Sequence, residues 1–449
     1  MKGISKTKVW LFALGQFGWA LLSGLIGTYL VNFYLPGDAD IAAGQPVLIP
    51  QGRVVLGFLT VIGLVTALGR LFDAVTDPLV ASFSDKCRSR AGRRIPFLKW
   101  SALPLAVCTV LVFCAPFPAD GAGRTLNSVW LCVFVLAYYF LITCYCTPYT
   151  ALYSEITHTE GERMMASTAI SFTFIMGQAV GYLGPVFWGP LAGTAGRVTA
   201  IRLVFAVFAA VALLCMYVPV FAIREGDYVD AKPSEAGVVE SLGKTFRNRP
   251  FRVFVCSDIF YWIGLTVFQT GIPYFVKDLI GLPEIWQSLL LVAMTALSLL
   301  FYIPINIVTR RTGKKPVVLF AFAMFTVAFL FTAFTGTFGS SQELKVAQGI
   351  LLIVLGSLPL AIFGILPQAM VADCAEYDRR KTGEDRQGMF FAARTFCFKL
   401  GQSIAMILFT SLATVGTGGL GYRLAAGLSA LLCLTGGVIL LFYDEKAVR

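Results

Sequence analysis

Two aspartates four positions apart, Asp73 and Asp77, lie inside an apolar stretch at residues 54–84. The length and hydropathy of this stretch predict a membrane-spanning helix, and a spacing of four places both carboxylates on one helical face together with Arg70. A charge near the bilayer centre costs about 2.5–3.5 kcal/mol on insertion scales, so such residues usually have a function. Because two acids outnumber one base, we expect this face to bind a cation or a proton. A structural cluster, in which Arg70 neutralises one carboxylate, is the alternative.

The composition is that of an integral membrane protein. Hydrophobic residues make up 57% of the 449 residues, charged residues make up 14%, and the mean hydropathy is +0.76. Apolar stretches long enough to cross about 30 Å of hydrocarbon recur along the chain. We therefore predict an all-α membrane protein with twelve transmembrane helices, at residues 9–35, 54–84, 97–117, 127–151, 166–191, 200–223, 251–277, 286–308, 315–338, 346–371, 388–413 and 424–443.

The distribution of basic residues predicts the orientation of these helices. Most of the 36 lysines and arginines fall at the two termini and near the loops that follow the even-numbered helices. The opposite loops contain Arg53, Arg124, Arg197, Arg202, Lys277, Lys345 and Arg423. By the positive-inside rule, both termini are expected in the cytoplasm. The basic loops would then face an anionic leaflet, which accounts for the net charge of +11 without a nucleic-acid partner.

Two common kinds of site are not indicated by the sequence. Most of the 11 cysteines lie inside the predicted helices, no Cys-x-x-Cys pair occurs, and the single histidine is His158 in a polar loop. We therefore expect neither a metal centre built from cysteine and histidine nor a disulfide framework. No arrangement of nucleophile and base is visible, so we expect neither an enzyme nor a bound cofactor.

Local motifs recur in the same order in the two halves of the chain. The matched segments are 92–96 with 313–316, 148–151 with 367–370, and 159–163 with 382–386. Their order predicts a duplicated six-helix unit, with an N-terminal half at 1–223, a cytoplasmic linker at 224–249 and a C-terminal half at 250–449. Parallel six-helix repeats are the architecture of major facilitator transporters. The basic loop at 85–94 resembles the signature of that superfamily and stands in the expected place.

Charged residues elsewhere in the predicted helices indicate where a substrate would bind. They are Asp258, Arg394 and Lys399, which bring the acids and bases inside the spans into balance, as expected if they meet in one cavity. Lys399 lies deep in the eleventh helix, and Thr395 lies one turn earlier on the same face. Asp258 lies one turn before Trp262 in the seventh helix. Asp258 has two possible roles: a bond to a neighbouring helix, or a contact with the substrate.

Two parts of the sequence carry a specific family resemblance. Residues 70–78, Arg-Leu-Phe-Asp-Ala-Val-Thr-Asp-Pro, resemble the second-helix motif of the glycoside–pentoside–hexuronide:cation symporters, the family of melibiose permease. Residues 371–377, 381–383 and 398–402 resemble the second hallmark of that family. The resemblance extends over the whole chain in topology. It implies a major facilitator fold and cation-coupled transport.

The resemblance also implies roles for single residues. Asp73 and Asp77 match the carboxylate ligands of the family's coupling cation, and Thr76 and Thr143 match its neutral oxygen ligands. Such donors suit a hard cation, Na⁺ or Li⁺, while protonation of one carboxylate is the alternative. Lys399 matches the family lysine that lies between the cation site and the sugar.

On the substrate side the chain departs from melibiose permease. Gln16 stands where that protein has a charged pair in the first helix, and Cys146 stands in place of its sugar-binding acid in the fourth helix. Thr395 matches a neighbouring polar contact, and Tyr149 and Thr150 follow closely after Cys146. The cation ligands are kept while the charges that hold a galactoside are lost, a pattern that also resembles the sodium-dependent lysophospholipid transporters.

From these features we predict a cation-coupled symporter of the inner (cytoplasmic) cell membrane, with a sugar or glycoside as its substrate. A sodium-dependent transporter of lysolipids or other amphipathic solutes is the alternative. A non-transporting sensor with a transporter fold is a third hypothesis. The expected partners are the small-molecule substrate, the coupling cation and the lipid bilayer, and the protein is expected to be a monomer.

Cysteine labelling tests the predicted orientation. In a cysteine-free background, a cysteine at position 88 should react only with reagents that reach the cytoplasm, because its loop is rich in basic residues. A cysteine at position 45 should react with impermeant reagents added outside the cell. Cytoplasmic reactivity at position 45 would overturn the charge argument and the helix count together.

Overall fold

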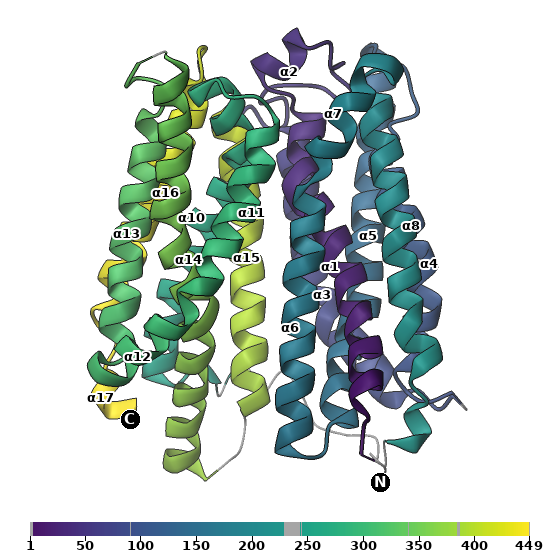
Figure 1. Cartoon of the computed structure of the whole chain (residues 1–449), viewed down its shortest axis with the longest axis vertical. Helices are drawn as coiled ribbons and strands as arrows, with labels where there is room; N and C mark the ends of the chain where they lie inside the picture. Colours follow the sequence, from purple (N-terminus) through teal and green to yellow (C-terminus); the bar gives the residue numbers. More distant parts are fainter. Residues whose placement is uncertain are drawn as a thin grey trace. The chain divides into compact units, whose positions relative to one another are not determined.

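The computed structural model describes residues 3–448, except residues 90, 229–242, 244, 340 and 384–386. Parts of the basic loop at 85–94, the predicted linker at 224–249 and the motif at 382–386 therefore lie outside the described residues. Within the described part of the chain, every long regular element is a helix (Figure 1).

The chain forms two compact units. The first comprises Met1–Pro36, Asp40–Gln51 and Leu71–Ala236, and the second comprises Gly37–Ala39, Gly52–Arg70 and Gly237–Arg449. The first unit contains α1 (Lys6–Tyr34), α4 (Ile95–Val112), α5 (Gly121–Ile156), α6 (Glu160–Tyr182), α7 (Gly184–Ala195), α8 (Arg197–Ala222) and η1 (Glu225–Asp227). The second contains α10 (Arg249–Tyr274), η2 (Phe275–Ile280), α11 (Ile285–Leu300), α12 (Tyr302–Thr312), α13 (Lys314–Phe334), α14 (Gln342–Thr382), α15 (Gln387–Ala413), α16 (Leu420–Leu440) and α17 (Glu445–Val448). The division passes through α2 (Asp38–Ala42) and through α3 (Val61–Lys86).

Most of the predicted membrane spans correspond to long apolar helices. Among the described residues, 10 helices are long and apolar enough to cross a membrane, and an eleventh span results if α11 and α12, bent by 50° at their junction, count as one. The remaining predicted span is α3, a helix of 26 residues that contains Arg70, Asp73 and Asp77. The chain is thus an all-helical, multi-pass membrane protein. The count of twelve depends on α3, in which the charges interrupt the apolar sequence.

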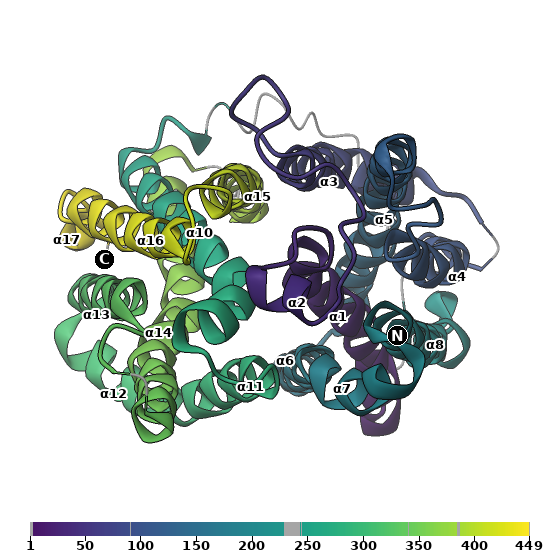
Figure 2. The ribbon, with the colours of Figure 1, turned by 90° about the horizontal axis from the view of Figure 1, so that it is seen from above.

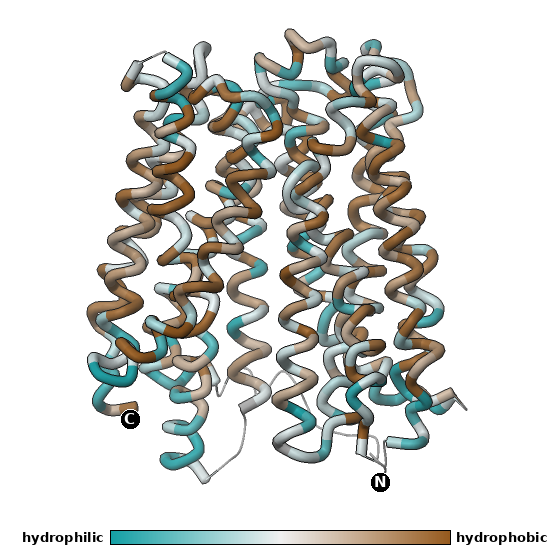
Figure 3. Tube along the Cα trace, in the orientation of Figure 1, coloured by the Kyte–Doolittle hydropathy of each residue, from teal (hydrophilic) through white to brown (hydrophobic). Residues whose placement is uncertain are grey.

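The largest differences between the predicted and the observed boundaries concern two spans. The second span was expected at 54–84, but α3 begins at Val61, and an isolated antiparallel bridge between Val55 and Leu59 shows that a turn precedes it. The tenth span was expected at 346–371, but α14 continues to Thr382. Figure 3 shows that α14 is hydrophobic along most of its length and hydrophilic at its C-terminal end. The last turn contains basic side chains, which interact favourably with the negative end of the helix dipole.

The packing order of the helices is the same in the two units. In the first unit α1 packs against α6 and α8, and α4 packs against α5 and α8. In the second unit α10 packs against α15 and α16, and α13 packs against α14 and α16 (Figure 2). Small residues permit the close approach, since a Cβ atom on Gly18 of α1 would lie 2.5 Å from the carbonyl oxygen of Ala212 in α8. The order of contacts among these helices therefore repeats in the two units, and the duplicated six-helix unit stays a prediction.

Large apolar side chains also cover the outside of the helices. Trp100 in α4 is 78% exposed and Leu214 in α8 is 71% exposed, and many similar residues line the other long helices. A water-soluble protein rarely exposes such continuous apolar surface. A lipid bilayer covers it, because hydrocarbon removes apolar side chains from water as effectively as a protein core does.

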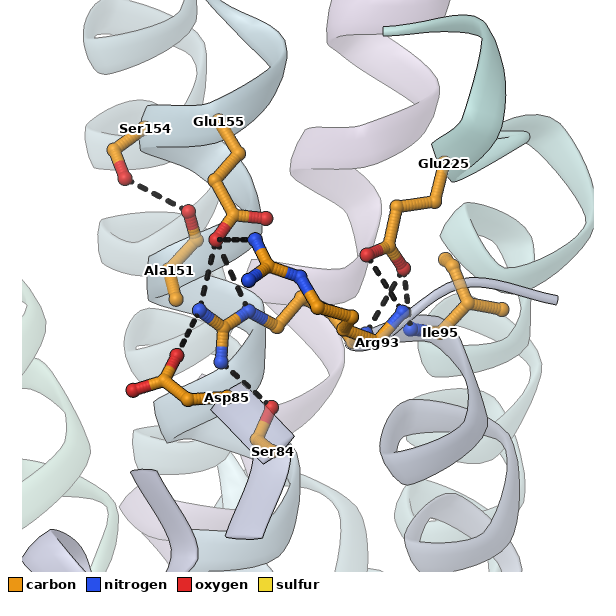
Figure 4. Close-up of polar contacts among 9 residues, drawn as sticks. Ser84, Asp85, Arg93, Ile95, Ala151, Ser154, Glu155 and Glu225 are labelled. Atoms are coloured by element: carbon orange, nitrogen blue, oxygen red, sulfur yellow. Dashed lines mark hydrogen bonds and ion pairs between the residues drawn. The ribbon is translucent and has the colours of Figure 1, made fainter. Parts of the chain in front are cut away.

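A buried carboxylate fixes the loop before α4 in the first unit. Glu225 of η1 accepts hydrogen bonds from the backbone N–H groups of Arg93 (2.7 Å), Arg94 (2.9 Å) and Ile95 (3.2 Å). These groups stand at the start of α4, where the helix leaves N–H groups unsatisfied and its dipole favours an anion. Figure 4 shows both oxygens of Glu225 directed at this turn.

The second unit repeats this contact at the corresponding place. Glu445 of α17 accepts hydrogen bonds from the N–H groups of Lys314 (2.7 Å) and Lys315 (3.1 Å) at the start of α13. The glycines before the two turns, Gly92 and Gly313, have φ angles of 108° and 98°, a conformation that other residues adopt only with strain. The repeated Gly-basic-basic motif therefore serves to present backbone N–H groups to a carboxylate.

Removing Glu225 should destabilise the first unit. Glu225→Ala leaves buried N–H groups of the α4 start without an acceptor, and we expect the free energy of unfolding to fall by about 1–3 kcal/mol. Asp227→Ala, which changes an exposed acid in the same short helix, is the matched control. Thermal unfolding in detergent measures both variants. If Glu225→Ala and the control melt at the same temperature, the hydrogen bonds from the start of α4 to Glu225 do not stabilise the unit.

Candidate functional site

The two aspartates of α3 face two threonines of α5 in the first unit. The hydroxyl of Thr143 lies 2.7 Å from Oδ1 of Asp73, and the hydroxyl of Thr147 lies 3.4 Å from Oδ1 of Asp77. Each pair is separated by the same 70 positions in the sequence. Since residues four apart lie on one helical face, α3 and α5 run side by side in one register.

Arg94 joins the same two helices beyond the carboxylate–hydroxyl pairs. Its guanidinium donates to Ser84 (2.8 Å) and Asp85 at the end of α3, and to Glu155 (2.8 Å) at the end of α5 (Figure 4). Asp85 and Glu155 are again 70 positions apart in the sequence, so a third contact keeps the register. Burial lowers the pKa of Arg94, but Glu155 and Asp85 outweigh it and hold the pKa above its ordinary value. The guanidinium therefore stays charged and ties the two helix ends together.

The threonine hydroxyls differ in what they can offer a cation. Thr143 also lies 3.0 Å from the carbonyl oxygen of Tyr139, so its one proton can go either to Asp73 or to the backbone. When the proton is on the Tyr139 side, the hydroxyl presents lone pairs toward the carboxylate face. Thr76, predicted as a ligand, donates to the carbonyl oxygens of Phe72 (2.9 Å) and Asp73 (3.2 Å) of its own helix. Its role as a ligand stays a prediction.

The predicted substrate residues of the first unit lie near α1 and α5. Tyr149 is buried, stacks on Phe12 at 4.3 Å between ring centroids and donates to the Phe12 carbonyl oxygen at 2.8 Å. Thr150 is exposed and bonds to the carbonyl oxygen of Cys146 at 2.9 Å. Gln16 is buried in α1 and accepts a hydrogen bond from Trp19 Nε1 at 3.2 Å. Tyr149 thus connects α5 to α1, whereas the side chain of Thr150 is exposed on the surface of α5.

In the second unit the structure brings Asp258 and Arg394 together. Nε of Arg394 lies 2.8 Å from Oδ2 of Asp258 and Nη2 lies 3.1 Å from Oδ1, so the two planar groups form a fork. Both side chains are buried. Trp262 stacks on Phe398 with 4.8 Å between ring centroids, and the Arg394 guanidinium lies 6.0 Å from the same ring. This geometry is that of a bond between α10 and α15, one of the two possibilities open for Asp258.

The remaining predicted residues lie in the second unit. Thr395 and Lys399 are half-buried and one turn apart on α15, as expected. Arg70 belongs to the part of α3 in the second unit, one residue before the division. Their contacts with a cation or substrate stay predictions.

Sequence reasoning missed Thr147. It follows Thr143 by four residues in the helix that faces the aspartates, so the spacing that identified Asp73 and Asp77 applies equally to the two threonines. A matching search for hydroxyls at a spacing of four would have found it. The resemblance to a known family directed attention to Thr143 alone.

The donor set of this region is chemically uniform. Carboxylate and hydroxyl oxygens are hard ligands that suit a small cation or a proton, and they contrast with the nitrogen and sulfur ligands of transition metals. In the described part of the chain, no group of three or more His, Cys, Asp or Glu side chains gathers to hold a metal ion.

Comparison with known proteins agrees with this chemistry. The family model described as "MFS/sugar transport protein" matches residues 11–443. The chain belongs to this family. It is 22% identical over 402 residues to the isoprimeverose transporter of Lactiplantibacillus pentosus, a match that covers 88% of this chain and 77% of the relative. It is 24% identical over 349 residues to the inner membrane symporter YicJ of Escherichia coli K12, covering 76% and 71% of the two chains.

A third relative is an animal protein. The sodium-dependent lysophosphatidylcholine symporter 1 of Mus musculus is 22% identical over 427 residues, which cover 88% of this chain and 75% of the relative. Among solved structures, the D-xylose–proton symporter superimposes with a TM-score of 0.67 at 14% identity, covering 98% of each chain. This likeness confirms the major facilitator fold. Fold and family are those of membrane transporters.

The Asp258–Arg394 pair can be tested as a structural bond. Arg394→Met or Asp258→Leu alone leaves a buried charge without its partner, and each should lower the free energy of unfolding by about 3–5 kcal/mol. The double variant should be much less damaging than the sum of the single changes. The exposed pair Glu376 and Arg380, changed in the same way, is the control and should give effects within about 1 kcal/mol. Additivity of the buried changes within about 0.5 kcal/mol, measured by unfolding in detergent, would exclude the bond.

Proposed function

We propose that the protein is a cation-coupled symporter of a sugar or glycoside, which works by alternating access of its two six-helix halves. The observation that carries this proposal is the pair of aspartates inside α3, each opposed by a threonine hydroxyl of α5. Two carboxylates at neighbouring turns of a membrane helix repel each other unless a cation or proton lies between or beside them. A site of this kind gives transport a dependence on a cation gradient.

Coupling follows from linkage between two ligands. A cation that binds at Asp73 and Asp77 changes the substrate affinity only if the two ligands favour the same conformation of the protein. The Arg94 network supports such a link, because it holds α3 and α5 in a fixed register and so transmits a displacement of one helix to the other. The coupling cation is Na⁺, Li⁺ or H⁺.

The proposed substrate class rests on the family and on two relatives. One relative is named as a transporter of isoprimeverose, and YicJ is named as an inner membrane symporter. Gln16 and Cys146 stand where melibiose permease has charged groups, so the sugar held here differs from a galactoside. The alternative substrate, a lysolipid, is favoured by the mouse relative, whose name states sodium-dependent transport of lysophosphatidylcholine.

The location proposed for the protein is the inner cell membrane, with both termini in the cytoplasm and the monomer as the working form. Support comes from the basic residues near the loops of one side and from the name of the relative YicJ. In this orientation the helix N-termini that bind Glu225 and Glu445 lie at the cytoplasmic ends of the two halves.

Uptake into proteoliposomes tests the proposal. Radiolabelled isoprimeverose should accumulate under an inward Na⁺ or H⁺ gradient and not under a choline gradient. Asp73→Asn and Asp77→Asn should each reduce accumulation at least tenfold while the protein stays folded, because each removes a charged cation ligand. Asp227→Asn, which changes an exposed acid outside the long helices, should behave as the unaltered protein.

The same assay separates the alternatives. Accumulation of lysophosphatidylcholine in place of the sugar would assign the second substrate class. Retention of gradient-dependent accumulation by both asparagine variants would show that the aspartates are not the coupling site. Binding of sugar without any transport would favour the sensor hypothesis.

A further inference from the structure

The outer face of α12 combines apolar and basic side chains. This helix packs against α13 and α14, and Ile305 on its inner face is only 4% exposed. Ile303 and Ile307 lie one turn apart on the opposite side and are 73% and 53% exposed. Arg310 and Arg311 follow in the last turn of the helix, and both are exposed. The outer face is therefore largely apolar over its first two turns and positively charged at its C-terminal end.

This change along α12 marks the place where the chain leaves the hydrocarbon. Together α11 and α12 are apolar enough to count as one membrane span, which is bent by 50° at their junction. A guanidinium group is costly inside hydrocarbon, so an arginine at the end of a span extends its side chain to the lipid headgroups. We therefore place Ile303 and Ile307 beside acyl chains, and the two arginines at the level of the lipid phosphates.

The charges of Arg310 and Arg311 are not balanced by acids of the described chain. Lys314, the nearest base after the helix, is paired with Asp373 of α14. The side chains of the two arginines form no hydrogen bond or ion pair with the residues that the structure describes. Two exposed guanidinium groups beside an apolar surface therefore attract an anion from outside the chain.

The first unit differs from the second at the corresponding position. When Gly92 is aligned with Gly313, Asp85 corresponds to Asn306. Asp85 binds the guanidinium of Arg94, whereas Asn306 donates to a carbonyl oxygen of its own helix at 2.9 Å. The second unit therefore lacks, at this position, the acid that balances a base in the first unit.

We propose that the outer face of α12 binds an anionic phospholipid, with its phosphate against Arg310 and Arg311 and an acyl chain along Ile303 and Ile307. Guanidinium groups donate pairs of hydrogen bonds to phosphate oxygens, and the exposed isoleucines cover the first part of the acyl chain. A zwitterionic lipid carries an ammonium group that offsets its phosphate, so it binds this face less well. The inference goes beyond transport and does not depend on which cation or solute is carried.

Lipid titration of the purified full-length protein tests this inference. The melting temperature in a neutral detergent is followed as phosphatidylglycerol or phosphatidylcholine is added to the micelles, because a lipid that binds the folded state stabilises it. Phosphatidylglycerol should act at a lower mole fraction than phosphatidylcholine. In the double variant Arg310→Gln/Arg311→Gln, the mole fraction of phosphatidylglycerol for half-maximal stabilisation should rise about tenfold or more, since each basic side chain contributes about a factor of five. Arg310→Lys/Arg311→Lys keeps both charges and should retain most of the effect.

A matched control comes from the corresponding loop of the first unit. Lys86 and Arg88 are exposed bases at the same relative position. Lys86→Gln/Arg88→Gln removes the same charge from the protein, and it should change the phosphatidylglycerol titration by no more than about threefold, because surface charges far from the lipid are screened. Comparing the shift caused by lipid, and not the melting temperature itself, removes any effect of the arginines on the α12 dipole.

A second variant and a soluble probe keep the test decisive. Ile303→Ser/Ile307→Ser leaves both arginines in place and should weaken phosphatidylglycerol binding about threefold or more, because the acyl chain loses apolar contact. Glycerol 1-phosphate, which carries the phosphate without acyl chains, should not stabilise the protein at comparable concentrations. Stabilisation by this soluble phosphate as strong as that by the lipid would overturn the lipid assignment.

Two other results would also overturn the inference. The first is equal stabilisation of the unaltered protein by phosphatidylglycerol and phosphatidylcholine. The second is an equal loss in the Arg310→Gln/Arg311→Gln and Lys86→Gln/Arg88→Gln variants, which would indicate attraction by overall charge and not a site on α12. None of these readouts requires a cation gradient or a transported solute, so their failure leaves the symporter proposal intact.

Discussion

The carboxylates of Asp73 and Asp77 have to be accommodated inside a membrane helix, and this requirement determines how α3 and α5 are arranged. Water is absent from the hydrocarbon region, so each carboxylate needs a polar partner from the protein or a bound ion. The threonines of α5 meet this need only if the two helices run side by side in one register. A shift of one residue would rotate the hydroxyls by about 100° around α5 and leave apolar side chains opposite the acids. The charged cluster at Arg94 holds the same register from the helix ends.

A second constraint recurs in the two units. Each half has a carboxylate, Glu225 or Glu445, that closes the N-terminus of its third long helix. The glycine before that helix is needed in both halves because its positive φ angle turns the backbone N–H groups toward the acid. What the two halves do not share is the pair of acids at neighbouring turns. The carboxylates of the proposed cation site belong to α3 alone, while in the second unit the buried acid nearest the middle of α10, Asp258, is bonded to Arg394.

The acids inside the long helices make two different kinds of polar contact. Asp258 and Arg394 neutralise each other with matched planar geometry, and such a pair is satisfied without any ligand. Asp73 and Asp77 contact neutral hydroxyls of α5, and a hydroxyl solvates a carboxylate without cancelling its charge. The first kind of contact holds two helices together, and the proposed cation site is of the second kind.

The sequence by itself determined the class of protein, the order of the helices and the position of the two acids. Apolar length, charge distribution and repeated motifs depend on local chemistry, which is readable along a single chain. The sequence also identified Thr143, through resemblance to a family and not through a known contact. Only the tertiary structure decided that Thr147 stands opposite Asp77, that Asp258 pairs with Arg394, and that Glu225 and Glu445 close helix ends far away in sequence. These contacts join positions that are 70 to 136 residues apart in the sequence. Packing sets how one helix is rotated about its axis relative to its neighbour, and the sequence pattern of either helix alone does not specify that rotation.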